Sequence, residues 1–399
     1  MESLLKYQQN LLEYTQGSFY RFLYDKIPWD QRMVAIKGLR GAGKTTLILQ
    51  HLKFGTETPA TSLYVTADHP WFYTHTLLDL ADEWSKVGGK VLYIDEVHKY
   101  KNWSRELKNI YDGYPGIKVV FTASSALDIY RGESDLSRRV LTYDLSGMSF
   151  REYIELLYQV KIEPITLADI LNNHVEISKV LGRKLKTPLL IFKKYLINGY
   201  LPFTADNEEA NYLTRLFHVI DTSISYDLAF IENYSKTHAV KIKKLLGVIA
   251  ESAPFEPNIS SIAQKLNLGR DTVNNFLQHL QSAHLLNLMN RPTQGIAALQ
   301  KPDKIYLENT NLSYALNANP DIGTLRETFL LNQLKNAGQK VELAQKGDFL
   351  INGKQTIEVG GKAKSAKQID GIGEAYIAAD EIEIGFGNKI PLWLFGFLY

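Results

Sequence analysis

Short apolar runs alternate with helical patterns of apolar positions over the first 150 residues of the chain. The runs span Met33 to Lys37, Ser62 to Thr66, Val91 to Ile94, Lys118 to Thr122 and Val140 to Leu145. Strands that alternate with helices in this way predict a parallel sheet covered by helices on both faces. An aromatic-rich segment with a helical pattern precedes them and ends at Pro28. We therefore expect a helical segment over residues 1–30 and an α/β domain over residues 31–150.

The pattern becomes helical after Phe150. Apolar residues such as Tyr153, Leu156 and Leu157 recur at helical spacing, and few strand-like runs appear before about Ser235. We expect a helical lid over residues 151–238. Next, two short helical patterns, Ile259 to Leu266 and Arg270 to Gln281, are separated by a turn that contains glycine. This is a helix-turn-helix pattern, and the run after it would begin a wing, so a winged-helix module is expected over residues 239–291.

The last part of the chain, residues 292–399, has a mixed pattern. A helix is expected over Leu325 to Asn336. Two strands, Phe349 to Ile351 and Thr356 to Val359, are joined by Asn352-Gly353, a strong signal for a hairpin turn. The apolar end of the chain, Ile390 to Tyr399, is interpreted as a buried strand. These elements predict a mixed α/β domain.

Composition narrows the class of protein. The chain has 399 residues, of which 45% are hydrophobic and 22% charged, which is typical of a folded protein with several domains. It has no cysteine, which excludes disulfides and thiolate metal sites. No apolar run reaches the roughly 20 residues that span a bilayer, and Met1 to Asn10 lacks the apolar stretch of a signal peptide. We expect a cytoplasmic location and no membrane contact. The net charge of +2 does not favour nucleic acid as a partner.

One segment has the composition of a phosphate-binding loop. It reads Gly38-Leu39-Arg40-Gly41-Ala42-Gly43-Lys44-Thr45, and Thr46 follows. The apolar strand Val34 to Ile36 precedes it and a helix follows, which is the context that such a loop requires. Glycines let backbone N–H groups converge on phosphate oxygens, and the helix N-terminus adds partial positive charge. The sequence predicts an ATP site in which Lys44 reaches the β- and γ-phosphates and Thr45 holds Mg²⁺.

Two carboxylates follow the third apolar run. Asp95 and Glu96 come directly after Val91-Leu92-Tyr93-Ile94, which predicts a buried strand. Asp95 would complete the magnesium shell beside Thr45. Glu96 would polarise the attacking water, and this position favours a hydrolysing ATPase over many P-loop kinases.

The segment Val119-Val120-Phe121-Thr122-Ala123-Ser124-Ser125 predicts a further strand that ends in hydroxyl side chains. In the additional-strand class of P-loop folds this strand lies between the other two, so that its tip faces the γ-phosphate. Ser124 is then a candidate for the residue that orients the water. The alternative role for Ser124 is to cap a helix over Ala126 to Tyr130, since serine is a good helix cap.

Several of these residues resemble a known family. Asp95-Glu96-Val97-His98-Lys99 followed by Asn102-Trp103 is similar to bacterial and archaeal predicted AAA+ superfamily ATPases. So is Ser137-Arg138-Arg139-Val140 running into Tyr143, Leu145 and Ser149-Phe150-Arg151-Glu152-Tyr153. The resemblance covers nearly the whole chain. It implies an ATPase core, a helical lid, a winged helix and a C-terminal domain of unknown function with a restriction-endonuclease-like fold.

The chain departs from the family at two positions. The family usually has Gly-Arg where Arg138-Arg139 stands, and proline where Gly147 stands. Arg139 takes the arginine position, and the resemblance implies that it senses the γ-phosphate, in the same chain or from a neighbouring copy. A homo-oligomer is thus one expectation. The alternative is a basic pair on the surface at the start of a strand.

The winged-helix module has two interpretations. Polar residues of its second helix would reach phosphates or base edges of DNA: Arg270, Thr272, Asn274, Asn275 and Gln278. Only one of them is cationic, and Asp271 opposes it, although phosphate neutralisation dominates DNA affinity. We therefore favour a packing role that couples the ATPase to the rest of the chain, and DNA contact stays open.

The C-terminal domain has part of a nuclease pattern. Asp348 and Glu358 occupy strand positions suited to a second magnesium site, and Glu327 lies on the preceding helix. A restriction-type nuclease also needs a lysine two residues after the second carboxylate, where Gly360 stands instead. Lys362 would fill the place only if the glycines there bulge. We expect a binding scaffold without cleavage activity.

The sequence predicts an ATP-binding protein with Mg²⁺-dependent hydrolysis that drives a partner- or DNA-binding C-terminal half. The first alternative is a nucleotide switch with negligible turnover that acts through protein partners. The second is an ATP-gated nuclease.

Overall fold

The structure, a computed structural model, describes residues 1–55, 59–124, 136, 138–206, 211–228, 234–252, 256–292 and 302–399. The chain divides into two compact units, Met1–Ser146 and Gly147–Tyr399. No helix among the described residues is both long enough and apolar enough to cross a membrane.

A five-stranded parallel sheet forms the centre of the first unit. Its strands have the order β2-β3-β4-β1-β5. Their bounds are β1 Met33–Gly38, β2 Ser62–Thr66, β3 Val91–Asp95, β4 Lys118–Ser124 and β5 Leu141–Asp144. Residues 91–95 are all buried because apolar side chains on both faces of β3 pack under helices. The predicted position of β4 between β1 and β3 is confirmed.

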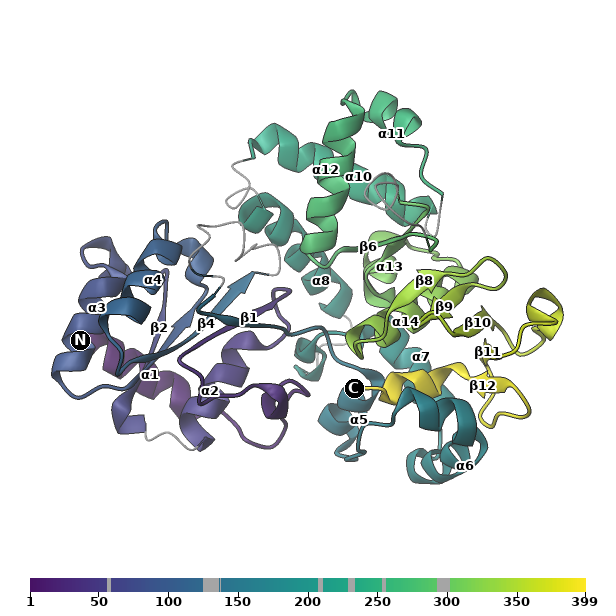
Figure 1. Ribbon diagram of the computed structural model, residues 1–399, viewed down its shortest axis with the longest axis horizontal. Coiled ribbons are helices and arrows are strands. Elements are labelled where there is room, and N and C mark those ends of the chain that lie inside the picture. The colour runs from purple at the N-terminus through teal and green to yellow at the C-terminus, as the bar shows by residue number, and fades with distance from the viewer. Residues whose placement is uncertain are drawn as a thin grey trace. The chain divides into compact units, whose positions relative to one another are not determined.

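Helices cover both faces of this sheet: α1 Glu2–Tyr14, α2 Lys44–Phe54, α3 Leu77–Lys86 and α4 Trp103–Gly113. In Figure 1, α3 and α4 lie on one face of the sheet and α1 and α2 on the other. The Gln8 side chain of α1 accepts the Tyr64 N–H at 2.6 Å and donates to the Ser62 carbonyl at 3.3 Å. These bonds satisfy the backbone of β2, which is an edge strand of the sheet.

The predicted helix up to Pro28 is wrong beyond Tyr14. The chain continues irregularly after α1, apart from the single 3-10 turn η1, Tyr24–Lys26. The reason is that Gln50 of α2 donates to the carbonyls of Gln16 and Phe19, at 2.9 and 2.8 Å. Those two carbonyls therefore accept hydrogen bonds from a neighbouring helix and not from N–H groups of their own segment, as they would in a helix.

The second unit begins with helices, as predicted. They are α5 Phe150–Tyr158, α6 Leu167–Leu185, α7 Pro188–Asn198 and α8 Tyr212–Thr222, followed by α10 Lys236–Ser252. Next come α11 Ile259–Leu266 and α12 Arg270–Ser282, joined by a short turn. Strands β6 Leu286–Met289 and β7 Lys304–Leu307 then form a two-stranded antiparallel sheet.

The end of the chain forms a mixed sheet beside α13 Thr310–Leu316 and α14 Ile322–Asn336. The strand order is β12-β11-β10-β9-β8. The bounds are β8 Val341–Leu343, β9 Phe349–Ile351, β10 Gln355–Gly360, β11 Ala375–Ala379 and β12 Lys389–Pro391. The hairpin at Asn352-Gly353 is confirmed: both residues have positive φ, 53° and 70°, as a type I′ turn requires.

The interpretation of Ile390 to Tyr399 as a strand is correct only at its start. β12 ends at Pro391, and the 3-10 helix η10 follows over Leu392–Phe397. Proline has no N–H to extend a ladder. A close approach of the chain also favours the turn, since a Cβ on Gly396 would lie 2.4 Å from the Cβ of Phe150.

Buried side-chain amides join the helices of this unit. The Asn311 carbonyl oxygen accepts the Tyr200 N–H at 2.8 Å and the Tyr212 hydroxyl at 2.6 Å. Asn332 donates to Glu308, whose pKa is raised by complete burial. Because unpaired polar groups would cost much in this interior, the network fixes how α7, α8, α13 and α14 pack.

Candidate nucleotide and magnesium site

The loop between β1 and α2 has the backbone of a phosphate-binding loop. Gly43, its last residue before the helix, has φ 98°, a conformation that side chains with a Cβ rarely adopt. Gly38 lies against the end of β5, and a Cβ there would stand 2.4 Å from the Leu145 carbonyl oxygen. Helix α2 then begins at Lys44, so the N–H groups of its first turn lie at the loop.

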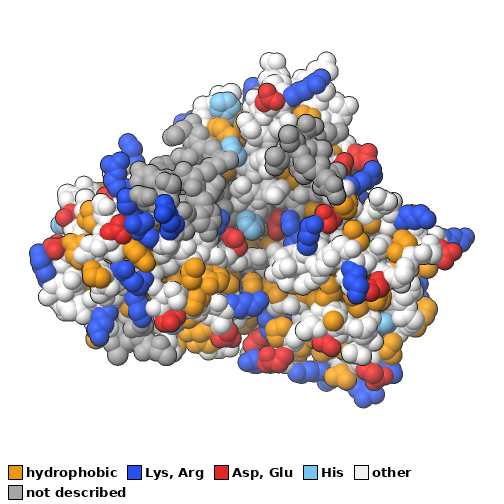
Figure 2. All heavy atoms as spheres, in the orientation of Figure 1, with side chains coloured by type: hydrophobic (Ala, Val, Ile, Leu, Met, Phe, Trp, Pro, Cys, Tyr) orange, Lys and Arg blue, Asp and Glu red, His pale blue; other side chains and the backbone are white. Residues whose placement is uncertain are grey.

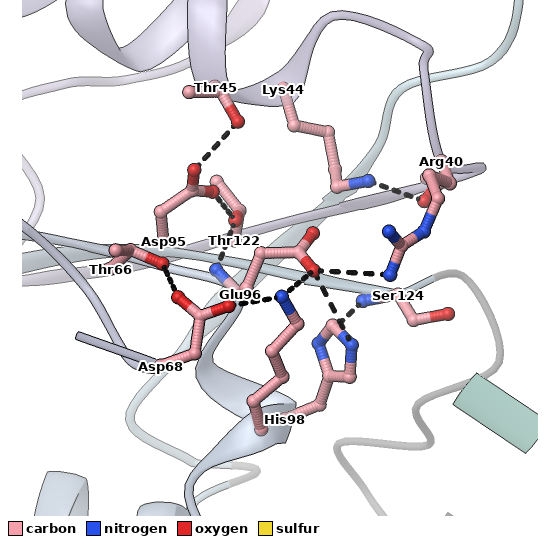
Figure 3. A network of polar contacts seen from close by, with 12 residues as sticks. Arg40, Lys44, Thr45, Thr66, Asp68, Asp95, Glu96, His98, Thr122 and Ser124 are labelled. Carbon is pink, nitrogen blue, oxygen red and sulfur yellow. Dashed lines mark hydrogen bonds and ion pairs between the residues drawn. The ribbon is translucent and has the colours of Figure 1, made fainter. Parts of the chain in front are cut away.

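Lys44 lies inside the loop and is 6% exposed. Its ammonium group donates to the carbonyls of Gly38 and Leu39, at 2.8 and 3.3 Å. Figure 3 shows this side chain beside the loop that carries it. The ammonium is therefore held at the loop, where a phosphate oxygen would replace carbonyl oxygens as its partner.

Asp95 receives hydroxyl hydrogen bonds from three elements. Thr45 donates to Oδ2 at 2.6 Å and Tyr64 donates to the same oxygen at 2.9 Å, while Thr122 donates to Oδ1. The structure thus brings together the two predicted magnesium residues, Thr45 and Asp95. A hydroxyl and a carboxylate are oxygen ligands that fit Mg²⁺, which completes its octahedron with substrate phosphates and water.

Tyr64 and Thr122 are site residues that sequence reasoning missed. Each lies in an apolar strand run, and in a strand pattern such residues look like core. Burial and the adjacent Asp95 raise the pKa of Tyr64 well above its ordinary value, so the phenol stays a proton donor to the carboxylate. The only usable signal was their place near the carboxyl ends of β2 and β4, where the strands of a parallel sheet present ligands.

Glu96 follows β3 in the left-handed backbone region, with φ 53° and ψ 40°. Its N–H donates to the Thr122 hydroxyl at 2.9 Å, which holds this uncommon conformation. Its Oε2 lies 3.3 Å from the Lys99 ammonium and 3.7 Å from the Arg40 guanidinium. The carboxylate therefore faces a cation of the phosphate loop across the site (Figure 3).

A second carboxylate shares Lys99. Asp68 accepts from Lys99 at 2.5 Å and from Thr66 at 2.6 Å. Burial raises the pKa of Asp68, but these hydrogen bonds outweigh it and hold the pKa below its ordinary value. Asp68 therefore stays negatively charged beside Glu96, and it shares the Lys99 ammonium with that residue.

Ser124 is the last residue of β4 and is 7% exposed. Its backbone N–H donates to Nδ1 of His98 at 3.3 Å. Figure 3 shows Ser124 on the same side of the sheet as Glu96 and His98. The alternative helix cap concerns residues 126–130, which lie outside the described residues.

Arg139 binds the end of α4. Its guanidinium contacts both carboxylate oxygens of Asp112, Nε at 2.9 Å and Nη2 at 3.0 Å, and lies over the Tyr111 ring at 5.7 Å. Arg138 beside it is exposed. In a surface role, Arg139 therefore has Asp112 as its partner. In a catalytic role, the Arg139 guanidinium would have to leave Asp112 and bind a phosphate group.

Substitution of Arg139 separates these roles. If Arg139 acts on transition-state charge, Arg139→Ala lowers turnover of ATP by more than about tenfold while the affinity for ATP changes little. The matched control is Arg138→Ala, which should keep wild-type turnover. Specific activity that rises with protein concentration would show that the arginine comes from a neighbouring copy. Wild-type turnover of Arg139→Ala at every concentration leaves only the pair with Asp112.

On α12, the predicted DNA-reading residues are partly accessible. Arg270, Asn275 and Gln278 are exposed, as is Asp271, while Thr272 and Asn274 are half-buried. Basic and acidic side chains are interspersed over most of the face seen in Figure 2. On α12 itself, the exposed Arg270 is followed by the exposed Asp271, so this helix presents polar groups without a strong positive field.

In the C-terminal sheet, Asp348 directly precedes β9, and Glu358 lies in the neighbouring strand β10. Asp348 accepts the Val359 N–H at 2.7 Å. Burial raises the pKa of Asp348 to about 6, and the nearby carboxylates of Glu327 and Glu358 contribute to the same shift. Glu327 itself accepts from Lys304 at 2.9 Å and from Tyr306 at 2.7 Å. Among the described residues no group of three or more Asp, Glu, His or Cys is arranged to hold a metal ion.

The amine near these carboxylates comes from a residue that the sequence did not indicate. Lys364 forms an ion pair with Glu358, whose side chain is 3% exposed. The stem of Lys364 lies over Gly360, where a Cβ would be 2.7 Å from the lysine Cβ and Cγ. Lys362, the predicted substitute, is exposed. Lys364 therefore occupies the space that a lysine at position 360 would use.

Comparison with known protein families agrees with the fold of the first unit. Residues 30–154 match the family model of an AAA domain. Residues 190–322 match a domain of unknown function, DUF8612. The first match contains the phosphate loop and the strands β3 and β4 of the five-stranded sheet. Residues 30–154 therefore form a domain that matches the AAA model, and the predicted resemblance to AAA+ ATPases is confirmed for this part of the chain.

Two curated relatives are similar over part of their length. The chain is 30% identical over 267 residues to the uncharacterized protein MJ1637 of Methanocaldococcus jannaschii, which covers 64% of this chain and 56% of that protein. It is 23% identical over 294 residues to one component of an ATP-dependent helicase/deoxyribonuclease of Listeria welshimeri, covering 69% of this chain and 23% of that protein. The chain thus spans about half of the first relative and a quarter of the second.

Two solved structures are also similar. The Aeropyrum pernix ORC1 protein in complex with DNA has 12% identity and a TM-score of 0.30, with 80% of this chain and 92% of that chain covered. AMPPCP-bound DnaA from Aquifex aeolicus has 13% identity and a TM-score of 0.27, with 70% and 88% covered. Similarities of this size identify no ligand or partner for this chain.

Proposed function

We propose that this protein binds ATP with Mg²⁺ at the phosphate loop and hydrolyses it. The observation that supports this most is the arrangement at the carboxyl ends of β1 and β3. There Thr45 binds Asp95 at 2.6 Å, and Glu96, the next residue, faces the loop. Thr45 and Asp95 would hold Mg²⁺, which would supply positive charge against the phosphates. The test is Mg²⁺-dependent phosphate release from ATP by the purified chain, and no release by the wild type would contradict hydrolysis.

Each residue has a separate task in this proposal. Lys44 leaves the carbonyls of its own loop for the β- and γ-phosphates, and the loop N–H groups bind the remaining oxygens, with residues 38–46 as the binding segment. Thr45 and Asp95 hold the metal. Glu96 accepts the proton of the attacking water, and Ser124 orients that water from the tip of β4.

The hydrolysing role is favoured over a pure nucleotide switch by the surroundings of Glu96. A switch needs no carboxylate beyond the metal ligand. Here a second one lies beside the loop: the Glu96 N–H donates to Thr122, and the Glu96 carboxylate pairs with Lys99 and Arg40. Single-turnover measurements distinguish the two functions: a switch would keep bound ATP intact for many minutes.

We propose that hydrolysis acts on a partner of the second unit, which comprises a helical lid (151–238), a winged helix (239–291) and a C-terminal domain (292–399). The buried network at Glu308, Asn311 and Asn332 would transmit movement between these parts as rigid bodies. DNA is one candidate partner, and another protein or a second copy of the chain is the other. Glu96→Gln protein trapped with ATP, purified with what it holds, would identify the partner.

For the C-terminal domain we propose a binding scaffold. The Lys364 ammonium already neutralises Glu358, and it therefore opposes a cation at the same carboxylate. The deoxyribonuclease named among the relatives matches over only a quarter of its length.

We therefore predict no metal-dependent DNA cleavage at ordinary enzyme concentrations. Wild type, Asp348→Ala and Lys364→Ala are compared on supercoiled and single-stranded DNA, with Mg²⁺ or Mn²⁺, with and without ATP. Lys362→Ala is the matched control, since that lysine is exposed. Nicking that disappears in the first two variants and persists in the control would contradict the scaffold and support an ATP-gated nuclease with Lys364 as its amine.

A further inference from the structure

His98 is buried between the strand ends that carry Glu96 and Ser124. It lies in the 3-10 turn η4, Val97–Lys99, directly after β3, and is 2% exposed. Its Nδ1 accepts the backbone N–H of Ser124 at 3.3 Å, and its Nε2 is 3.9 Å from Oε2 of Glu96. Figure 3 shows the imidazole beside both residues. One side chain thus contacts the candidate base and the strand that carries the candidate water-orienting hydroxyl.

The contact with Ser124 determines which nitrogen carries the proton. A backbone N–H is always a donor, so Nδ1 must offer its lone pair. In the neutral ring the proton is then on Nε2, the nitrogen that faces Glu96. A movement of less than about 1 Å would shorten the present separation to an ordinary N–H···O hydrogen bond. The fold therefore aims a neutral donor at the carboxylate.

A neutral donor affects Glu96 differently from the two cations near it. Lys99 and Arg40 attract the carboxylate as whole charges, 3.3 and 3.7 Å from Oε2. A single N–H donor instead defines the direction of one carboxylate oxygen, because a hydrogen bond prefers a nearly linear geometry. Arg40 belongs to the phosphate loop, so an incoming γ-phosphate would compete with Glu96 for its charge. His98, in contrast, is attached to the sheet and would stay.

We propose that His98 is a positioning residue for ATP hydrolysis. Its Nε2–H holds the Glu96 carboxylate in line with the tip of β4, so that the base and the Ser124 hydroxyl bind one water in a fixed geometry. This inference rests on the proposed hydrolysis at Glu96. It assigns a task to a histidine that the family match and the motif leave without one.

The test uses two substitutions of similar volume. His98→Phe keeps an aromatic ring in the buried place and removes both nitrogens, whereas His98→Gln restores an N–H that can reach Glu96. We expect His98→Phe to lower kcat by about 10- to 100-fold, the range that misplacement of a catalytic group produces. The Kd for a non-hydrolysable ATP analogue should stay within about threefold of wild type, since His98 lies outside the phosphate loop. We expect His98→Gln to recover most of kcat.

Single-turnover rates in a Glu96→Gln background supply the second measurement. If His98 acts through Glu96, His98→Phe should add less than about a twofold further loss there, because coupled residues are not additive. Equal losses of kcat in the Phe and Gln variants, or a full further loss in the Glu96→Gln background, would overturn the inference while leaving hydrolysis intact. A wild type without turnover would overturn both the inference and the proposed function.

Discussion

Lys44→Ala should abolish detectable binding of ATP. In the structure this ammonium donates to oxygens of its own loop, the carbonyls of Gly38 and Leu39. In the proposed site Lys44 binds the β- and γ-phosphates, and a charge-assisted hydrogen bond is roughly twice as strong as a neutral one. Loss of this group should therefore weaken binding by at least about a hundredfold.

Calorimetric titration of ATP and Mg²⁺ into the variant measures this effect. The matched control is Lys86→Ala, because Lys86 is an exposed lysine of the same unit that pairs with Asp82. That variant should bind as the wild type does. Unchanged affinity in Lys44→Ala, with a folded protein, would show that the nucleotide lies elsewhere.

Glu96→Gln should keep ATP bound and lose hydrolysis. The amide has the size of the carboxylate but cannot accept the proton of the water, and general-base catalysis contributes about 10²- to 10⁴-fold. Binding should be equal or tighter, because Arg40 and Lys99 lose their pairing with Glu96 and are left for the γ-phosphate. Glu83→Gln, which changes a carboxylate on α3, is the control.

The readout is the ratio of bound ATP to ADP after incubation with Mg²⁺. ATP should persist in Glu96→Gln and be converted by the wild type and the control variant. Turnover in Glu96→Gln within a few-fold of wild type would mean that another group activates the water.

The candidate nucleotide site could be proposed from the sequence because its residues are adjacent along the chain. The loop from Gly38 to Thr45 is marked by its glycines, and the pair Asp95-Glu96 is marked by the apolar strand that precedes it. The alternation of strands and helices then predicted the sheet, including β4 between β1 and β3. The spacing of residues is enough for a prediction where the functional side chains and the strand or helix that positions them lie in one short segment.

Residues that act across the sheet were not predictable in this way. Tyr64 and Thr122 reach Asp95 from two other strands, and their apolar neighbours make them look like core. Lys364 reaches Glu358 only because the chain turns back after Gly360. The segment after Tyr14 was misread as helix because Gln50, far along the sequence, binds its carbonyls.

We propose that the first unit hydrolyses ATP with the metal held by Thr45 and Asp95 and the water activated by Glu96. The most direct measurement is single-turnover conversion of γ-labelled ATP by an excess of the wild-type chain, quenched over time, with Mg²⁺ or with EDTA. We predict complete conversion with Mg²⁺ and at least about a hundredfold slower conversion with EDTA or in Glu96→Gln. Tight binding of ATP by the wild type without conversion in Mg²⁺, or equal rates in Glu96→Gln, would contradict it.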